Sequence, residues 1–261
     1  MSERKILIFA GTYEGHALAE RFSERGWQQK ADFCVATDYG TEVLADIKGL
    51  SVIEGRLDRS DMERMLADDT YGMVIDATHP YARVVTENLK AACESTGTEY
   101  IRLLREAVPL DGFLEPSGNA ASVITVSSAE EAASFLLETE GMILLTTGSK
   151  ELHCYKALAD RVVARVLPSH ESLRLCEEAE IPSKHIICMQ GPFSREMNLA
   201  TIRQYGCSWL VTKNTGKPGG FEDKLACLED GCRIMVIGRP AEEKGVSLEE
   251  AEARAEEFYG A

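Results

Sequence analysis

Short apolar runs alternate with amphipathic stretches along nearly the whole chain, and this rhythm is the strongest constraint on its fold. The apolar runs are rich in Ile, Val and Leu and are bounded by Gly, Asp or Thr, as buried strands are. Between them apolar residues recur at helical spacing, for example Val84, Val85, Leu89 and Cys93. Apolar strands that alternate with helices predict parallel sheets covered by helices on both faces.

The alternation places the predicted elements in two groups. In the first half, strands are expected at residues 5–10, 33–37, 50–53, 73–77 and 100–104, and helices at 15–25, 41–47, 60–67 and 82–95. In the second half, strands are expected at 122–126, 142–146, 162–167, 186–189, 209–212 and 233–237, and helices at 129–138, 171–178, 195–204, 221–228 and 248–258.

The rhythm breaks at residues 105–119, where Pro109, Gly112, Pro116 and Gly118 are typical of a connection between domains. We therefore expect an α/β protein of two parallel-sheet domains, at residues 1–108 and 121–261, joined by a linker at 109–120. The carboxyl ends of parallel strands open onto one edge of a sheet, where ligands bind. We expect the two edges to face each other across a cleft.

The charge balance narrows the classes of partner. Lys and Arg number 28 against 43 Asp and Glu, a net charge of −15. Binding of nucleic acid or of an anionic membrane surface needs a surplus of cations, so neither partner is expected. The sequence has no apolar run of about 18 residues and no signal peptide, which predicts a cytoplasmic protein. An anionic small molecule remains compatible where cations gather locally.

The eight cysteines lie mostly in apolar surroundings. Those in or beside strand-like or helix-like runs are Cys34, Cys93, Cys176, Cys188 and Cys207. This placement predicts buried, reduced thiols rather than disulfides. There is no Cys-x-x-Cys motif, and the closest pair, Cys227 and Cys232, has no His nearby, so no metal site is expected.

Glycines and polar residues cluster just after the predicted strands. After the first strand, Gly11-Thr12-Tyr13-Glu14-Gly15 forms a turn into a helix, and the N–H groups of a helix start can hold a pyrophosphate. Asp38 follows the second strand, where a carboxylate accepts hydrogen bonds from an adenosine ribose and disfavours a 2′-phosphate. We predict that Gly11, Thr12, Glu14, Gly15 and Asp38 bind NADH or NADPH, with NADH favoured by Asp38. Simple turns at both positions are the alternative.

The string Asp76-Ala77-Thr78-His79-Pro80-Tyr81-Ala82 is the densest polar cluster of the first half. In a doubly wound sheet its strand ends next to the Gly11 turn. Pro80 keeps His79 extended, so that Thr78 and His79 can contact the cofactor and His79 or Tyr81 can relay a proton. A structural histidine that caps the turn is the alternative.

Three strand ends of the second half carry groups that attract anions. They are Thr147-Gly148-Ser149-Lys150, then Gln190 and Gly191 with Ser194 and Arg195, and finally Lys213, Gly216, Lys217 and Gly220. Cations that converge on one edge of an acidic protein predict a ligand with several carboxylates. Ordinary solvated cations are the alternative. The last loop lacks the spacing of a phosphate-binding P-loop.

These motifs, in this order, resemble the precorrin-6A reductase family, and its cobalt-precorrin-6A reductase branch in particular. The resemblance covers nearly the whole chain and is most specific at Asp76-Ala77-Thr78-His79-Pro80-Tyr81-Ala82. It implies two Rossmann-like domains, one for a reduced nicotinamide cofactor, often NADPH, and one for the macrocycle. It also implies reduction of one carbon–carbon double bond of (cobalt-)precorrin-6A, a tetrapyrrole with several carboxylates, to (cobalt-)precorrin-6B in cobalamin biosynthesis.

Two other functions are compatible with the residues alone. A sugar-nucleotide glycosyltransferase also pairs two such domains, but it would ignore nicotinamide. A non-enzymatic dinucleotide-sensing module would have no use for a second anion site. The chain lacks the His-Glu-x-x-His and Gly-x-Ser-x-Gly motifs, which argues against zinc and serine hydrolysis.

Overall fold

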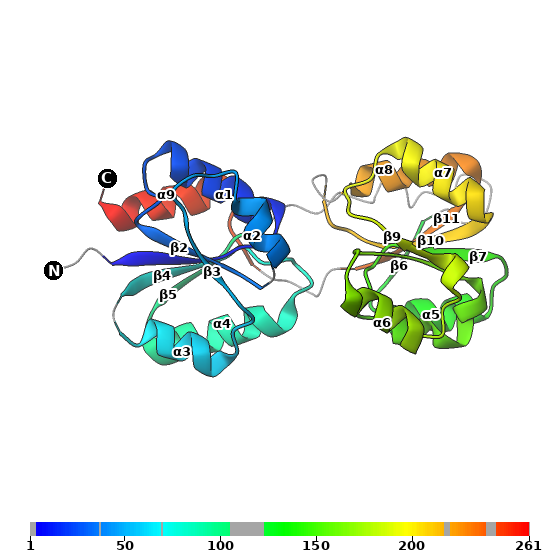
Figure 1. The fold of residues 1–261 in the computed structure, drawn as a ribbon, viewed down its shortest axis with the longest axis horizontal. Helices are drawn as coiled ribbons and strands as arrows, with labels where there is room; N and C mark the ends of the chain where they lie inside the picture. The colour runs from blue at the N-terminus through cyan, green and yellow to red at the C-terminus, as the bar shows by residue number, and fades with distance from the viewer. Residues whose placement is uncertain are drawn as a thin grey trace. The chain divides into compact units, whose positions relative to one another are not determined.

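The computed structural model describes residues 4–36, 38–68, 70–104, 123–216, 220–238 and 244–260, apart from the side chains of Asp38 and Tyr39. The chain divides into a first unit, Met1–Arg105 with Ala241–Ala261, and a second unit, Glu106–Pro240 (Figure 1). The predicted linker at 109–120 lies outside the described residues. Both units are α/β with wholly parallel sheets, which confirms the predicted fold class.

The sheet of the first unit has the strand order β3-β2-β1-β4-β5. Its elements are β1 (Lys5–Phe9), α1 (Tyr13–Glu24), β2 (Ala31–Val35), α2 (Asp38–Leu44), β3 (Ser51–Glu54), α3 (Arg59–Leu66), β4 (Tyr71–Asp76), α4 (Arg83–Thr96), β5 (Glu99–Arg102) and α9 (Leu248–Tyr259). Helices α1, α2 and α9 cover one face and α3 and α4 the other (Figure 1). Because strand side chains alternate between faces, Ile6 and Ile8 enter one apolar core while Leu7 and Phe9 enter the other.

The sheet of the second unit has the order β6-β11-β10-β7-β8-β9. Its elements are β6 (Val123–Val126), α5 (Ala129–Leu137), β7 (Met142–Leu145), η1 (Leu152–Arg161), β8 (Val162–Val166), α6 (His170–Glu178), η2 (Ser183–His185), β9 (Ile186–Cys188), α7 (Arg195–Tyr205), β10 (Cys207–Lys213), α8 (Phe221–Leu225), η4 (Ala226–Asp230) and β11 (Arg233–Ile237). Helices α5 and α6 lie on one face and α7 and α8 on the other (Figure 1). Each predicted strand is present in the two sheets.

Two 3₁₀ segments, η1 and the single turn η2, lie where the sequence predicted no helix. The 3₁₀ helix η1 buries Leu152, Tyr155 and Leu158, which are three residues apart. That spacing is the period of a 3₁₀ helix and not the 3.6-residue period of an α-helix. The periodicity that predicted the other helices therefore gave no signal here.

The C-terminal helix α9 corrects the predicted domain boundary, which assigned residues 121–261 to the second domain. Ala251 and Ala255 are fully buried in the core of the first unit. Val246 forms a parallel bridge to Leu103, and Arg21 of α1 donates a hydrogen bond to Glu252 at 2.6 Å. The first unit is thus built from both ends of the sequence, as the neighbouring α1 and α9 show in Figure 1.

The thiols and the surface agree in part with expectation. All eight cysteines are free, as predicted, but Cys188 is exposed and Cys154 is half-buried rather than buried.

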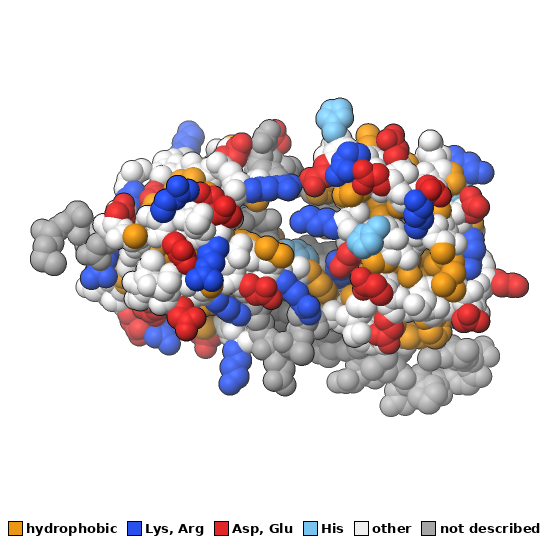
Figure 2. Space-filling view, turned by 90° about the horizontal axis from the view of Figure 1, so that it is seen from below, with side chains coloured by type: hydrophobic (Ala, Val, Ile, Leu, Met, Phe, Trp, Pro, Cys, Tyr) orange, Lys and Arg blue, Asp and Glu red, His pale blue; other side chains and the backbone are white. Residues whose placement is uncertain are grey.

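On the face shown in Figure 2, acidic and basic side chains are interspersed on both units. Sites that attract anions must therefore be identified from individual residues.

Among the described residues no helix has the length and apolar character needed to cross a membrane.

The packing of α9 predicts that Ala255→Glu destabilises the first unit. A carboxylate at this fully buried position has to enter an apolar core, and we expect a loss of at least about 2 kcal/mol in the free energy of unfolding. Thermal and denaturant unfolding measure it. Ala253→Glu, at an exposed position of the same helix, is the control. Equal stability of the two variants would contradict the packing of α9 on the first unit.

Candidate functional site

The predicted site loops lie at the points where the two sheets reverse their winding. In the first unit the chain runs outward through β1, β2 and β3 and then returns to β4 on the other side of β1. In the second unit it runs outward through β7, β8 and β9 and returns to β10 on the other side of β7. Ligands of parallel α/β sheets bind outside the strand carboxyl ends at such reversals. The loops after β1 and β4, and those after β7 and β10, occupy these two places.

Thr12 joins the two loops of the first unit. Its side chain caps α1 by accepting a hydrogen bond from the Gly15 N–H at 3.2 Å. The same hydroxyl donates to the Ala77 carbonyl at 2.8 Å, at the end of β4. The expectation that the 76–82 string lies beside the Gly11 turn is therefore confirmed.

Glycine is needed at the two positions of the turn for different physical reasons. Gly11 has a φ of +108°, which side chains rarely adopt, and a Cβ there would meet no atom within 4 Å. A Cβ at Gly15 would lie 2.8 Å from the Ala10 Cβ, so this glycine lets α1 pack closely on β1. Gly11 thus leaves the backbone open for close approach at the sheet edge.

Two acidic residues flank this edge. Glu14 is buried in the first turn of α1, where a carboxylate interacts favourably with the helix dipole. Asp38 begins α2, after β2, which pairs with β1. Its backbone therefore belongs to the same edge, while its side chain lies outside the described part of the chain.

The buried carboxylate of Asp76 organises the loop after β4. It is fully buried and accepts a hydrogen bond from Arg102 Nη1 at 2.7 Å, in an ion pair in which Arg102 is also buried. It also accepts hydrogen bonds from four further donors: the Thr78 N–H at 3.0 Å, the Thr78 hydroxyl at 2.7 Å, the Thr86 hydroxyl at 2.8 Å and the Tyr100 hydroxyl at 2.9 Å. Such a saturated carboxylate fixes the backbone around it. Thr78, predicted to contact the cofactor, is committed to this network.

His79 and Tyr81 lie together on the loop that Asp76 fixes. The Tyr81 N–H donates to Nδ1 of His79 at 3.3 Å, and the two ring centroids are 5.6 Å apart. Because Nδ1 accepts a hydrogen bond, a neutral His79 carries its proton on Nε2. Arg102 supports the turn by donating to the His79 carbonyl at 3.4 Å.

In the second unit, the loops after β7 and β10 are joined. The Thr146 hydroxyl donates to the Val211 carbonyl at 3.0 Å, and Lys213 pairs with Glu151 at 2.6 Å. The hydroxyl of Thr147 is buried and has no hydrogen-bond partner among the described residues. Lys150 is exposed, and Ser149 contacts the hydroxyl of Ser172 at 3.3 Å. The structure brings Thr147–Lys150 and Lys213 together, although Lys213 already has a counter-ion.

The loop after β9 meets the start of α8. A Cβ at Gly220 would lie 3.5 Å from the Pro192 Cβ, so Gly220 approaches the segment that also contains Gln190 and Gly191. Ser194 caps α7 by accepting a hydrogen bond from Met197, and Arg195 pairs with Glu229. These two residues therefore have structural partners that the sequence did not reveal. The Gly216 carbonyl accepts a hydrogen bond from the Phe221 N–H, at the start of α8, at 3.4 Å, and Lys217 lies outside the described residues.

Two buried cations that the sequence did not predict lie next to the loop after β9 and the start of α8. Arg165 of β8 donates to Asn198 at 2.9 Å, and its guanidinium carbon lies 3.8 Å from the centre of the Phe193 ring. Its Nη2 has no hydrogen-bond partner among the described residues, and burial lowers its pKa to about 10. Lys224 of α8 is also buried. Burial first, and then the charge of Arg165, lower the pKa of Lys224 to about 8.

Neither buried cation forms an ion pair with a carboxylate in the part of the chain that the structure describes. Adjacent buried charges of one sign are costly unless an anion neutralises them. The one sequence feature that could have revealed a buried cation is a charged residue inside an apolar strand, as Arg165 is in β8 and Arg102 is in β5.

Comparisons with known proteins agree on one family. The family model described as precorrin-6x reductase CbiJ/CobK matches residues 5–256. The cobalt-precorrin-6A reductase of Priestia megaterium is 36% identical over 250 residues, 92% of each chain. That of Salmonella typhimurium is 34% identical and covers 92% of this chain and 89% of its own. The solved structure of a CobK precorrin-6A reductase has the same fold, with a TM-score of 0.77, 22% identity and coverage of 98% and 97%.

The Asp76 network predicts a large effect of Arg102→Gln. Removal of the guanidinium leaves a buried carboxylate without its counter-ion, and we expect a loss of about 3–5 kcal/mol in the free energy of unfolding. Denaturant unfolding measures it. Arg64→Gln, which breaks the exposed pair with Asp61, is the control and should cost less than about 1 kcal/mol. Similar losses in the two variants would show that Asp76 does not depend on Arg102.

Proposed function

The chain belongs to the precorrin-6x reductase family CbiJ/CobK, and we propose that it reduces one carbon–carbon double bond of (cobalt-)precorrin-6A, with NADH or NADPH as reductant, to give (cobalt-)precorrin-6B. It is accordingly an oxidoreductase of cobalamin biosynthesis. The observation that carries the proposal is the family match along nearly the whole chain, with the sequence motifs at both winding reversals. This membership favours the reductase over the glycosyltransferase and the sensing module. We place the enzyme in the cytoplasm, in keeping with its free thiols.

The first unit is proposed to bind the nicotinamide cofactor. The strand order, the open backbone at Gly11 and the start of α1 suit a dinucleotide, because helix N–H groups and close backbone approach recognise a pyrophosphate. Thr12 and Gly15 shape this turn, and the buried Glu14 occupies the helix start beside it. Asp38 is proposed to bind the ribose hydroxyls and to favour NADH, whereas the family resemblance favours NADPH.

The loop after β4 is proposed to carry the proton that completes the reduction. The cofactor, when bound, supplies a hydride to one carbon of the double bond. The neighbouring carbon needs a proton, for which His79, Tyr81 and water are the candidates. The two side chains lie on one loop at this edge. The Asp76–Arg102 pair holds that loop in one conformation, so that the donor is oriented before the substrate arrives. Thr78 supports the loop from within the same network.

The second unit is proposed to bind the carboxylates of the macrocycle. The hydroxyl of Thr147, which has no hydrogen-bond partner among the described residues, and the exposed Lys150 offer a donor and a cation at one loop. Arg165 and Lys224 add positive potential beside Phe193 and Gly220, where a carboxylate of the ligand would supply a counter-ion. Ser149, Gln190, Gly191, Ser194, Arg195, Lys213, Gly216 and Lys217 remain proposed contributors. Because hydride transfer needs contact, the macrocycle has to touch the nicotinamide in the reacting complex.

A direct test is anaerobic oxidation of NADH or NADPH in the presence of precorrin-6A and of its cobalt form. We expect cofactor oxidation only with macrocycle present, and deuterium transfer from deuterated cofactor to a carbon of the product. Binding titrations with each component alone establish affinity separately. Cofactor binding without any macrocycle-dependent oxidation would overturn the reductase proposal.

The Gly11 turn predicts that Gly11→Ala weakens cofactor binding. The added methyl group enters the open space that the backbone offers, and the φ of +108° is strained for alanine by roughly 1–3 kcal/mol. We expect the dissociation constant of the cofactor to rise at least about tenfold, measured by fluorescence titration. Gly97→Ala, at a left-handed helix end of the same unit with equally open surroundings, controls for strain. An equal effect of both variants would remove Gly11 from the cofactor site.

The burial of Lys224 predicts that its replacement by an uncharged residue has opposite effects on the stability of the fold and on ligand binding. Between its pKa of about 8 and the ordinary value of 10.5 the unfolded chain binds more protons, so the free energy of unfolding rises with pH there. At pH 7 the penalty for the buried charge is fully present, and Lys224→Met should stabilise the protein by on the order of 2 kcal/mol. The same change should weaken binding of a porphyrin polycarboxylate at least about tenfold.

The pH dependence provides the check on Lys224. The affinity of the unaltered protein for the porphyrin should fall as the pH rises through about 8, and Lys224→Met should lack this fall. Lys184→Met, at an exposed lysine of the same unit, should change neither stability nor affinity appreciably. If Lys224→Met binds the porphyrin as well as the unaltered protein does, the buried cations do not hold a carboxylate.

A further inference from the structure

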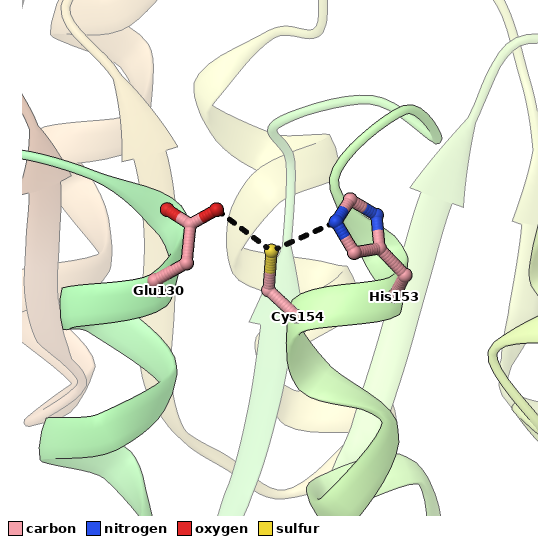
Figure 3. A group of neighbouring side chains, drawn as sticks. All are labelled: Glu130, His153 and Cys154. Atoms are coloured by element: carbon pink, nitrogen blue, oxygen red, sulfur yellow. Dashed lines mark hydrogen bonds between the residues drawn. The ribbon is translucent and has the colours of Figure 1, made fainter.

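Three side chains of different chemistry converge at the surface of the second unit, on the helices α5 and η1. Glu130 lies in the first turn of α5, and His153 and Cys154 lie in the first turn of η1 (Figure 3). One carboxylate oxygen, one imidazole nitrogen and the sulfur all lie within 4.8 Å of one another. No other such group of His, Cys, Asp and Glu occurs among the described residues.

Two of the three distances between the donor atoms match the edges of a metal-coordination tetrahedron. The Cys154 Sγ lies 3.5 Å from Glu130 Oε1 and 3.5 Å from His153 Nε2 (Figure 3). A sulfur about 2.3 Å and a nitrogen or oxygen about 2.1 Å from one tetrahedral zinc ion are separated by about 3.5 Å. Small adjustments of exposed side chains would therefore place all three donors around one ion.

The histidine is held as a metal ligand usually is. Its Nδ1 lies 3.2 Å from the carbonyl oxygen of Lys150, an acceptor, so Nδ1 carries the proton and donates it. Nε2 is then the unprotonated nitrogen, and Figure 3 shows it directed at the sulfur. A backbone carbonyl that fixes the tautomer and the orientation of the ring is the usual outer partner of a zinc-bound histidine.

The cluster has more acceptors than protons. The thiol offers one hydrogen, while both the Glu130 carboxylate and Nε2 of His153 accept. One of the two acceptors is left facing the sulfur without a donor between them. A metal cation is coordinated by the carboxylate oxygen, Nε2 and the sulfur at once. The thiol releases its proton to water when the sulfur binds the ion.

We propose that Glu130, His153 and Cys154 form a binding site for a zinc ion, with water as the fourth ligand. Sulfur, imidazole and carboxylate together favour Zn²⁺ over the hard cations Mg²⁺ and Ca²⁺, which take oxygen ligands. The site joins α5 to η1 and reaches the Lys150 carbonyl through His153, so zinc braces the end of the 147–150 loop. The proposal stands independently of the reductase function.

The site is tested by metal binding to the full-length protein, purified without metal and kept reduced with a phosphine. Competition with a chromophoric chelator gives the zinc affinity, and Co²⁺ serves as a spectroscopic substitute. We expect one zinc per chain, a thiolate-to-cobalt charge-transfer band and the intense visible bands of a tetrahedral cobalt site. Zinc should also raise the melting temperature.

Matched variants locate the ligands. Cys154→Ser and Glu130→Gln should weaken zinc binding at least about tenfold, and Cys154→Ser should remove the charge-transfer band. Cys188→Ser, at an exposed thiol of β9, and Glu131→Gln, beside Glu130 on α5, should bind zinc as the unaltered protein does. Circular dichroism of the metal-free variants verifies folding. Zinc affinity unchanged by Cys154→Ser and Glu130→Gln, or lost equally in Cys188→Ser, would overturn the proposal, and so would magnesium binding as tight as zinc.

Discussion

Parallel pairing of the strands constrains everything else in this molecule. Parallel neighbours can be formed only if the chain crosses back over a face of the sheet, so helices must alternate with strands, and all strand carboxyl ends gather at one edge. Where the winding reverses, between β1 and β4 and between β7 and β10, neighbouring loops leave in opposite directions. The residues capable of chemistry lie on these loops because the topology leaves backbone and side chains accessible there.

The two edges handle buried charge in opposite ways. In the first unit the negative Asp76 is neutralised by Arg102 and saturated with hydrogen bonds, so its contribution is a fixed loop. In the second unit the charge of the buried Arg165 lowers the pKa of the buried Lys224, and the charge of Asp223 offsets this effect only in part, so the two cations contribute a positive potential. A protein with a net charge of −15 can in this way carry a local positive potential without a surplus of basic residues.

The sequence predicted the strands and most helices because their signal is local: apolar runs and 3.6-residue periodicity depend only on near neighbours. It did not predict η1, whose buried residues repeat at intervals of three, or the attachment of α9, whose partners are more than two hundred residues away. The same limit applies to the site. The loops were identifiable from their glycines and their positions after strands, but the pairing of Arg195 with Glu229 and of Lys213 with Glu151 depends on tertiary packing. The Glu130–His153–Cys154 group was missed for the same reason, since its members come from two helices with no recognised spacing.

The return of α9 to the first unit has a consequence for how the protein is made. A ribosome releases residues 106–240 before the last helix of the first unit emerges, so the second unit can complete its core while the first still lacks the segment that covers Phe22 and Trp27. Until then the nascent first unit exposes an apolar surface to other chains and to chaperones. The units are therefore completed in the reverse of the order in which they begin along the chain: the unit that begins first is finished last.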